Sequence, residues 1–84
     1  MTIPKELTIG GFIVEIRQVK GLPTDGNCVG ETTILLDAEM SDTEKELALL
    51  HELLHRINPQ LSEVDIEWIS RGLHQIFHDN KMLR

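Results

Sequence analysis

The residues best suited to chemistry are His51, Glu52 and His55, within the run HELLH at 51–55. In a helix, residues four apart lie on one face, one turn apart, so both imidazoles can bind one metal ion. Glu52 lies at the edge of that face, where it can reach a metal-bound water without binding the ion itself. This is the arrangement of the HExxH motif, which combines two zinc ligands with a general base. The spacing therefore predicts a site for one zinc ion, with Glu52 as the catalytic residue.

An ordinary amphipathic helix is the competing interpretation, because histidines four apart also occur by chance on solvated helix faces. Here the pair lies in an apolar stretch formed by Leu49, Leu50, Leu53 and Leu54. Two imidazoles and a glutamate against such a surface would be costly to bury without partners. The leucines therefore favour the metal site.

A catalytic zinc site needs a third protein ligand, with water completing the tetrahedron. The extended pattern HExxHxxGxxH is absent, because Asn58 and Leu61 stand where it requires glycine and histidine. The ligand should then come from the following helix. The candidates there are Glu63, Asp65, Glu67, His74 and His78.

Antiparallel packing about a turn near residue 60 ranks these candidates. It places Glu67 opposite residue 53, between the histidines, and Glu63 opposite residue 57, nearer the turn. His74 falls opposite residue 46, so Glu67 is the expected ligand, with Glu63 second and His74 third. Another role open to His74 is hydrogen bonding to a reacting oxyanion. His78 is expected to interact with the helix dipole.

The elements that must position these residues begin with strands. Residues 7–36 have β character, since the run LTIGGFIVEIRQV (7–19) is rich in β-branched residues and partly alternates. Two further strands are expected over 28–31 and 32–39. We expect a small antiparallel sheet with hairpin connections.

The second half of the chain is helical. Ser41 and Thr43 are each followed three residues later by glutamate, so either can form a capping box that starts the first helix. Pro59 ends this helix, and the second starts near Ser62 and continues to about residue 80. Gly72 inside it predicts close packing against a neighbour. The short connection predicts that the two helices pack antiparallel, which gives an α+β fold.

Composition narrows the class of protein. A chain of 84 residues forms one domain, 1–84, without room for a second core. Its 14 acidic against 8 basic side chains argue against nonspecific nucleic-acid binding. A single cysteine, Cys28, excludes an internal disulfide and suits a reducing cytoplasm. We expect a cytoplasmic protein, because the start of the chain lacks signal-peptide features and no apolar run could span a membrane.

Two longer stretches resemble a known family: ILLDAEMSDTEKELALLHELLHRI at 34–57 and VDIEWISRGLHQIF at 64–77. Together they resemble the minimal zincin-like metallopeptidases of phages and bacterial mobile elements, gluzincin-like relatives of the ImmA/IrrE-type metallo-endopeptidases. The resemblance implies that His51 and His55 bind zinc, that Glu52 activates water, and that Glu67 is the third ligand. It also implies a protein or peptide substrate, such as a repressor or a host protein. The strand TTILLD (32–37) would be the sheet edge along which that substrate lies.

The favoured function is therefore zinc-dependent hydrolysis of peptide bonds. The main alternative is a non-catalytic domain in which zinc stabilises a protein-interaction surface. A third possibility is an α+β interaction domain without metal. An open coordination position would separate the first two, because structural zinc sites are closed by four protein ligands.

Overall fold

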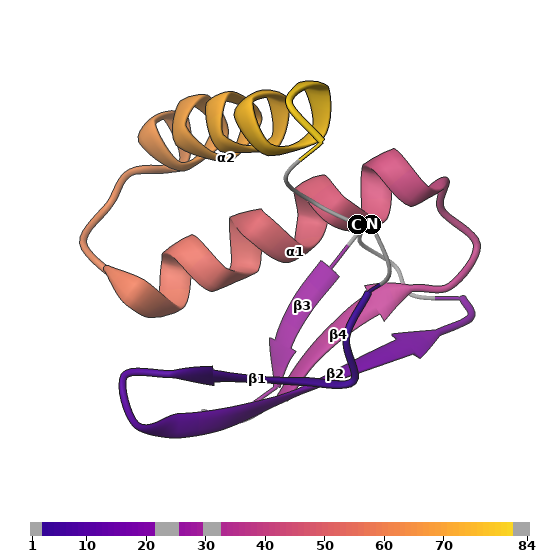
Figure 1. Ribbon diagram of the computed structural model, residues 1–84. Helices are drawn as coiled ribbons and strands as arrows, with labels where there is room; N and C mark the ends of the chain where they lie inside the picture. The colour runs from indigo at the N-terminus through magenta and orange to yellow at the C-terminus, as the bar shows by residue number, and fades with distance from the viewer. Residues whose placement is uncertain (1–2, 22–25, 30–32, 82–84) are drawn as a thin grey trace.

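The computed structural model describes residues 3–21, 26–29 and 33–81, with the backbone alone considered for 26–29 (Figure 1). Four strands precede two helices in the described part of the chain. The strands are β1 (Glu6–Ile9), β2 (Phe12–Val19), β3 (Gly26–Val29) and β4 (Thr33–Asp37). The helices are α1 (Asp42–Ile57) and α2 (Glu63–Asp79). The predicted α+β class is confirmed.

The run 7–19 forms two strands rather than the one expected. Gly10 and Gly11 connect β1 to β2 in a two-residue hairpin, with φ angles of 55° and 85°. Positive φ at both positions is typical of a type I′ turn, which glycine adopts at no steric cost. Ile9 pairs with Phe12 directly beside this turn. The Gly-Gly dipeptide was therefore the sequence signal for the missed hairpin.

The sheet is mixed, so the expectation of a wholly antiparallel sheet is wrong. The strand order is β1-β2-β4-β3, with β1/β2 and β3/β4 antiparallel and β2/β4 parallel. The parallel pair arises because β3 lies beyond β4. The chain therefore crosses to the far side of the sheet before β4 returns to pair with β2.

This order places β4 inside the sheet, between β2 and β3. Hydrogen bonding to both neighbours uses the backbone groups that a substrate strand would need. The expectation that TTILLD is a free edge is therefore wrong. Among the described strands, the outer edges belong to β1 and β3.

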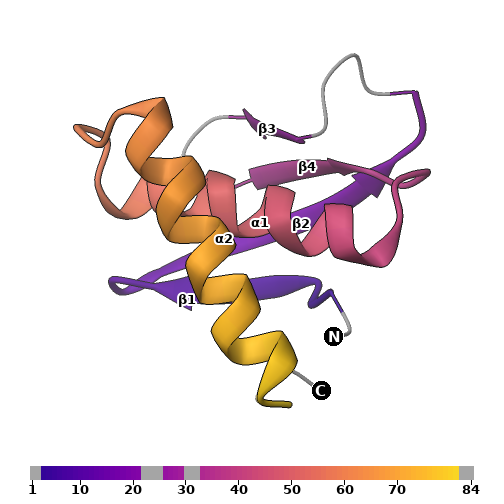
Figure 2. The ribbon, with the colours of Figure 1, turned by 90° about the horizontal axis from the view of Figure 1, so that it is seen from above.

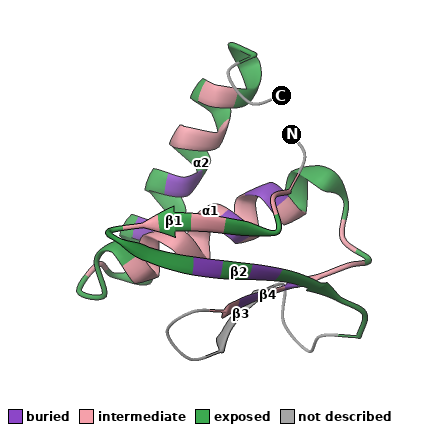
Figure 3. Ribbon diagram, turned by 60° about the horizontal axis from the view of Figure 1, so that its bottom comes forward, coloured by how far each residue is buried: buried purple, intermediate pink, exposed green. Residues whose placement is uncertain are grey.

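The elements form three layers: the sheet, α1 across one of its faces, and α2 on the other side of α1 (Figure 1). Alternation along the strands directs Val14 and Ile16 of β2, and Ile34 and Leu36 of β4, into the core with Leu49 of α1. These buried segments appear in purple in Figure 3. The core thus fixes which side of α1 faces the sheet and leaves the opposite side for α2.

Capping residues set the start of each helix. The Ser41 hydroxyl accepts a hydrogen bond from the Glu44 backbone N–H at 3.2 Å and donates one to the Glu44 carboxylate at 2.9 Å. Of the two possible pairs, Ser41 and Glu44 therefore form the one that caps the helix. Ser62 caps α2 by accepting from the Asp65 backbone N–H at 3.1 Å, as expected.

The two helices run in opposite senses in Figure 1, but Figure 2 shows α2 crossing α1 obliquely. The prediction of close packing at Gly72 is wrong, because a Cβ atom there would meet nothing within 4 Å. The buried α2 residues are Ile66 and Ser70. Ser70, rather than Gly72, is therefore the small residue that α2 buries.

Candidate metal centre

His51 and His55 project from the side of α1 that faces α2. Their Nε2 atoms lie 3.2 Å apart, and their ring centroids are 4.8 Å apart. Both side chains are partly buried. The prediction that the two imidazoles share one helix face is confirmed.

Glu63 of α2 reaches both of these nitrogen atoms. One carboxylate oxygen lies 3.1 Å from Nε2 of His51, and the other lies 2.9 Å from Nε2 of His55. One ligand atom from each of the three residues lies within 4.8 Å of the others. Zinc bonds of 2.0–2.1 Å in a tetrahedron separate neighbouring ligand atoms by about 3.3 Å, close to the distances seen here. A set of two imidazoles and one carboxylate therefore fits zinc in both chemistry and spacing.

Glu67, the expected third ligand, lies on the other side of the His51 ring. Its carboxylate oxygen is 3.1 Å from Nδ1 of His51, whereas Glu63 faces Nε2. A carboxylate on the second ring nitrogen typically orients a metal-binding histidine and makes it a stronger ligand. The distances thus favour Glu63, which ranked second from the sequence, as the third ligand. Glu67 would instead orient the ring of His51.

The oblique crossing explains the change of rank. Counting residues outward from the turn assumes that the two helix axes are aligned along their length. Because α2 crosses α1 at an angle (Figure 2), this assumption fails, and Glu63 in the first turn of α2 lies beside both histidines. Glu63 therefore contacts residues 51 and 55, although the count of residues placed it opposite residue 57.

The hydrogen-bonding capacity of His51 supplies a second argument for a cation. If Nδ1 donates its proton to Glu67, a neutral ring presents a lone pair at Nε2. That lone pair faces a Glu63 oxygen and His55 Nε2, which lie 3.1 Å and 3.2 Å away. A proton or a metal ion between these atoms resolves the repulsion. Either a doubly protonated imidazole or a bound metal ion therefore fits this arrangement.

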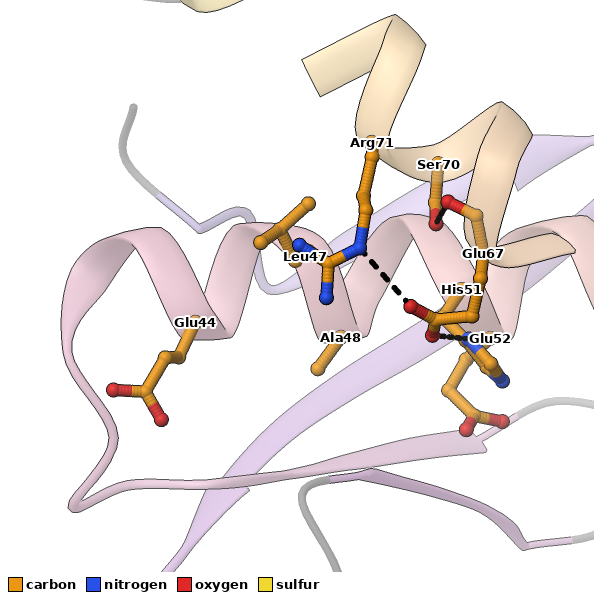
Figure 4. Close-up of a pocket in the computed structure, with 8 residues that line it drawn as sticks. All are labelled: Glu44, Leu47, Ala48, His51, Glu52, Glu67, Ser70 and Arg71. Atoms are coloured by element: carbon orange, nitrogen blue, oxygen red, sulfur yellow. Dashed lines mark hydrogen bonds and ion pairs between the residues drawn. The ribbon is translucent and has the colours of Figure 1, made fainter. Parts of the chain in front are cut away.

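Glu52 lies beside this group, in a pocket of about 320 Å³ between the helices. In Figure 4, His51 and Glu52 enter from α1, while Ser70, Glu67 and Arg71 descend from α2. The pocket is lined by Glu44, Leu47, Ala48, His51, Glu52, Glu67, Ser70 and Arg71. A carboxylate and a candidate metal-binding imidazole that line the same pocket are suited to activating a water molecule.

His74 lies at the other end of the interface, where its Nε2 is 2.7 Å from a carboxylate oxygen of Glu46. The predicted register, with His74 opposite residue 46, is confirmed. Glu46 is only 2% exposed. Burial alone raises the pKa of its carboxyl group, but hydrogen bonding, chiefly with His74, and nearby positive charge together lower the pKa below its ordinary value. His74 is not among the residues that line the pocket.

The other two candidates from the second helix, His78 and Asp65, are not part of the group formed by His51, His55 and Glu63. His78 is exposed, stacks on His74, and has its Nδ1 3.4 Å from a carboxylate oxygen of Asp79. Asp65 is exposed in the first turn of α2. Cys28 lies in β3, and its side chain falls outside the described part of the chain.

Sequence reasoning missed two residues, Glu46 and Arg71. A glutamate within a leucine-rich helix was the available signal for Glu46, because buried carboxylates require a partner. For Arg71 the signal was its position four residues after Glu67, which permits an ion pair on one helix face. That pair is present, with Arg71 Nε 3.2 Å from a Glu67 oxygen.

Comparisons of the chain with protein-family models, curated protein sequences and solved structures find no match. Neither helix in the described residues is long and apolar enough to cross a membrane. The function must therefore be argued from the geometry of the site.

Proposed function

We propose that this protein is a zinc-dependent peptidase whose zinc ion is bound by His51, His55 and Glu63. The observation that carries the proposal is the convergence of one ligand atom from each residue within 4.8 Å, beside a pocket lined by Glu52. Two histidines and one carboxylate form a three-ligand set that leaves a position for water, as catalytic zinc sites do. The resemblance to ImmA/IrrE-type metallo-endopeptidases supports the same activity.

Bound zinc would polarise the scissile carbonyl group and lower the pKa of water. The residues of the chain do the rest. Glu67 holds the ring of His51 through Nδ1, which fixes the direction of Nε2. Glu52 accepts a proton from the attacking water and delivers it to the leaving amine nitrogen. In this mechanism a single residue, Glu52, transfers the proton from the attacking water to the leaving nitrogen.

The substrate in this proposal is an extended segment of a protein, such as a repressor or a host protein. Because β4 is paired on both sides, the substrate strand must use another edge of the sheet. β3 is an outer strand that packs against α1, the helix bearing the histidines. We therefore place the substrate along the outer edge of β3. The single cysteine suits action in the cytoplasm.

The test is the substitution Glu52→Gln, which removes the base but no zinc ligand. Hydrolysis of quenched fluorescent peptides by the zinc-loaded protein should fall by about 10²–10⁴-fold. Elemental analysis should find an unchanged zinc content. Glu44→Gln is the matched control, because Glu44 lines the same pocket and its amide oxygen can still accept from Ser41. Full activity in Glu52→Gln would disprove the mechanism.

A second candidate is a non-catalytic domain in which zinc joins α1 to α2. The observation that favours it is the exposure of Trp68 and Val64 on α2, since exposed apolar residues are frequent in protein-binding surfaces. In that case zinc would raise the unfolding temperature equally in the wild type and in Glu52→Gln. Neither protein would hydrolyse any peptide.

A further inference from the structure

The proposed reaction would be faster with a hydrogen-bond donor that acts beside the zinc ion, and the zinc-binding residues do not supply one. As water adds to a peptide carbonyl group, negative charge develops on the carbonyl oxygen, and preorganised donors aimed at that oxygen lower the barrier. His74 was one candidate for this role, but its Nε2 faces Glu46 outside the pocket. The donor must therefore be found among the residues that line the pocket.

Three of the lining side chains carry N–H or O–H groups. The ring nitrogens of His51 face Glu67 and Glu63. The hydroxyl of Ser70 is buried and donates to the Glu67 backbone carbonyl at 3.2 Å. The third side chain is Arg71, and it alone has donors left over.

Arg71 extends from α2 across the pocket, with its guanidinium group above Leu47 and Ala48 of α1 (Figure 4). Its Nε donates to Glu67 at 3.2 Å. Within the described part of the chain, its two terminal nitrogens make no hydrogen bond or ion pair, and the side chain is 69% exposed. A guanidinium group presents its donors in a rigid planar fork. The contact with Glu67 orients this fork while leaving its outer donors open to the pocket.

We propose that Arg71 is a catalytic residue that donates hydrogen bonds from its terminal nitrogens to the oxyanion of the reacting peptide. This inference rests on the proposed peptidase function. As the oxygen of water bonds to the carbonyl carbon, the C=O electron pair moves onto the carbonyl oxygen, and Arg71 stabilises that charge. The C=O bond then re-forms, and the C–N bond breaks. Its electron pair stays on nitrogen, which takes the proton carried by Glu52, while Arg71 keeps all of its own protons.

A purely structural role for Arg71 gives a different expectation. If Arg71 acted only by holding Glu67, it would affect the orientation of His51 and hence the affinity for zinc. An oxyanion donor instead affects ligands with a charged tetrahedral centre, with zinc binding unchanged. Measurements of ligand affinity therefore separate the two roles without relying on turnover.

The experiment compares two ligands of the zinc-loaded protein by isothermal titration calorimetry. A phosphinic tripeptide with alanine side chains carries charged oxygens where the oxyanion forms, whereas acetohydroxamate binds the metal and lacks that tetrahedral centre. In Arg71→Ala the affinity for the phosphinic peptide should fall about 100-fold, with acetohydroxamate and zinc affinities unchanged. Arg71→Lys should keep the zinc affinity but bind the phosphinic peptide less tightly than the wild type, since one ammonium group cannot reproduce the planar fork. Arg17→Ala is the matched control, because it removes an exposed, ion-paired arginine from the sheet.

Unchanged phosphinic peptide affinity in Arg71→Ala would overturn the inference. So would a loss of zinc affinity equal to the loss of phosphinic peptide affinity, because Arg71 would then only position Glu67. In both cases the wild type still hydrolyses peptides. Failure of the proposed function is recognised separately, by a wild-type protein that binds no zinc or hydrolyses no peptide, and that result overturns both proposals.

Discussion

The two ends of the α1–α2 interface use the same residue types in different ways. At one end, Glu46 of α1 meets His74 of α2 at a distance of 2.7 Å. At the other end the residue types are exchanged between the helices, with the histidines on α1 and the glutamates on α2. There the Glu63 side chain is 70% exposed and touches two imidazoles at once. Glu46, in contrast, is buried.

The difference lies in how many ligand atoms converge and in their access to solvent. One imidazole and one carboxylate can satisfy each other with a single shared proton, as in the contact between His74 and Glu46. At the other end His51 faces a carboxylate on each of its ring nitrogens, and a neutral imidazole has only one proton for the two contacts. Solvent can also reach the Glu63 carboxylate there. A single histidine facing a glutamate across two helices can therefore be explained as a structural contact. Two histidines facing one glutamate instead form a set of ligand atoms that could hold a metal ion.

The largest expected effect comes from removing the contact between Glu46 and His74, which we call the structural end of the interface. Glu46→Ala leaves His74 without its partner and should lower the free energy of unfolding by about 3 kcal/mol. The zinc affinity should not change, because the metal-binding atoms lie at the other end of the interface. Urea unfolding with and without zinc measures the first effect, and competition with a chelator measures the second. Glu6→Ala, an exposed glutamate on β1, is the control.

A loss of less than about 0.5 kcal/mol in Glu46→Ala, as at ordinary surface positions, would contradict the structural role. A fall in zinc affinity along with stability would show that the two ends are not separate.

The next largest effect compares Glu63 and Glu67, the two glutamates beside the histidines at the other end of the interface. Glu67→Gln should lower the zinc affinity about 10–100-fold, as is typical when the partner of a metal-binding histidine is changed. Glu63→Ala should lower it by more, because it removes a ligand. Competition with a fluorescent zinc chelator compares the two variants directly. If Glu67→Gln has the greater effect, Glu67 is the third ligand, as counting along the helices suggested.

The smallest effect is the pH dependence of the structural end. Because the pKa of Glu46 is lowered in the folded protein, the unfolded chain binds more protons in the acidic range, and stability rises with pH there. The contribution is complete above the unfolded pKa of about 4.3 and is lost as the pH falls through the folded value. Metal-free wild type and Glu46→Gln, unfolded in urea from neutral to acidic pH, should therefore converge in stability at low pH. A difference that does not vary with pH would mean that the Glu46 carboxylate is not charged in this contact.

Local features of the site could be predicted from the sequence. The pairing of His51 with His55 follows from helix geometry, and Ser41 and Ser62 start their helices through capping interactions that span three residues. The position of His74 opposite residue 46 also followed from a count of residues about the turn, but its contact with Glu46 was not predicted. All of these depend on short separations or on one helix pair.

Features that depend on tertiary arrangement could not be predicted in the same way. The parallel pairing of β2 with β4 depends on where β3 lies, and alternation along a strand carries no information on that. Whether Glu63 or Glu67 faces the Nε2 atoms of the histidines depends on the angle at which the helices cross. Residue spacing along the chain does not determine that angle. The central position of β4 likewise follows only from the complete strand order.

The layered arrangement has a thermodynamic consequence. α2 packs chiefly on α1, on the side away from the sheet, and it carries Glu63, Glu67 and Arg71. An ion held by residues of both helices would be linked to the docking of α2. Binding of the ion would stabilise the docking of α2 on α1, and docking would strengthen binding of the ion by the same free energy, because such coupling is reciprocal. A partner that drew α2 away from α1 would therefore release the metal and separate Arg71 from Glu52 in a single event.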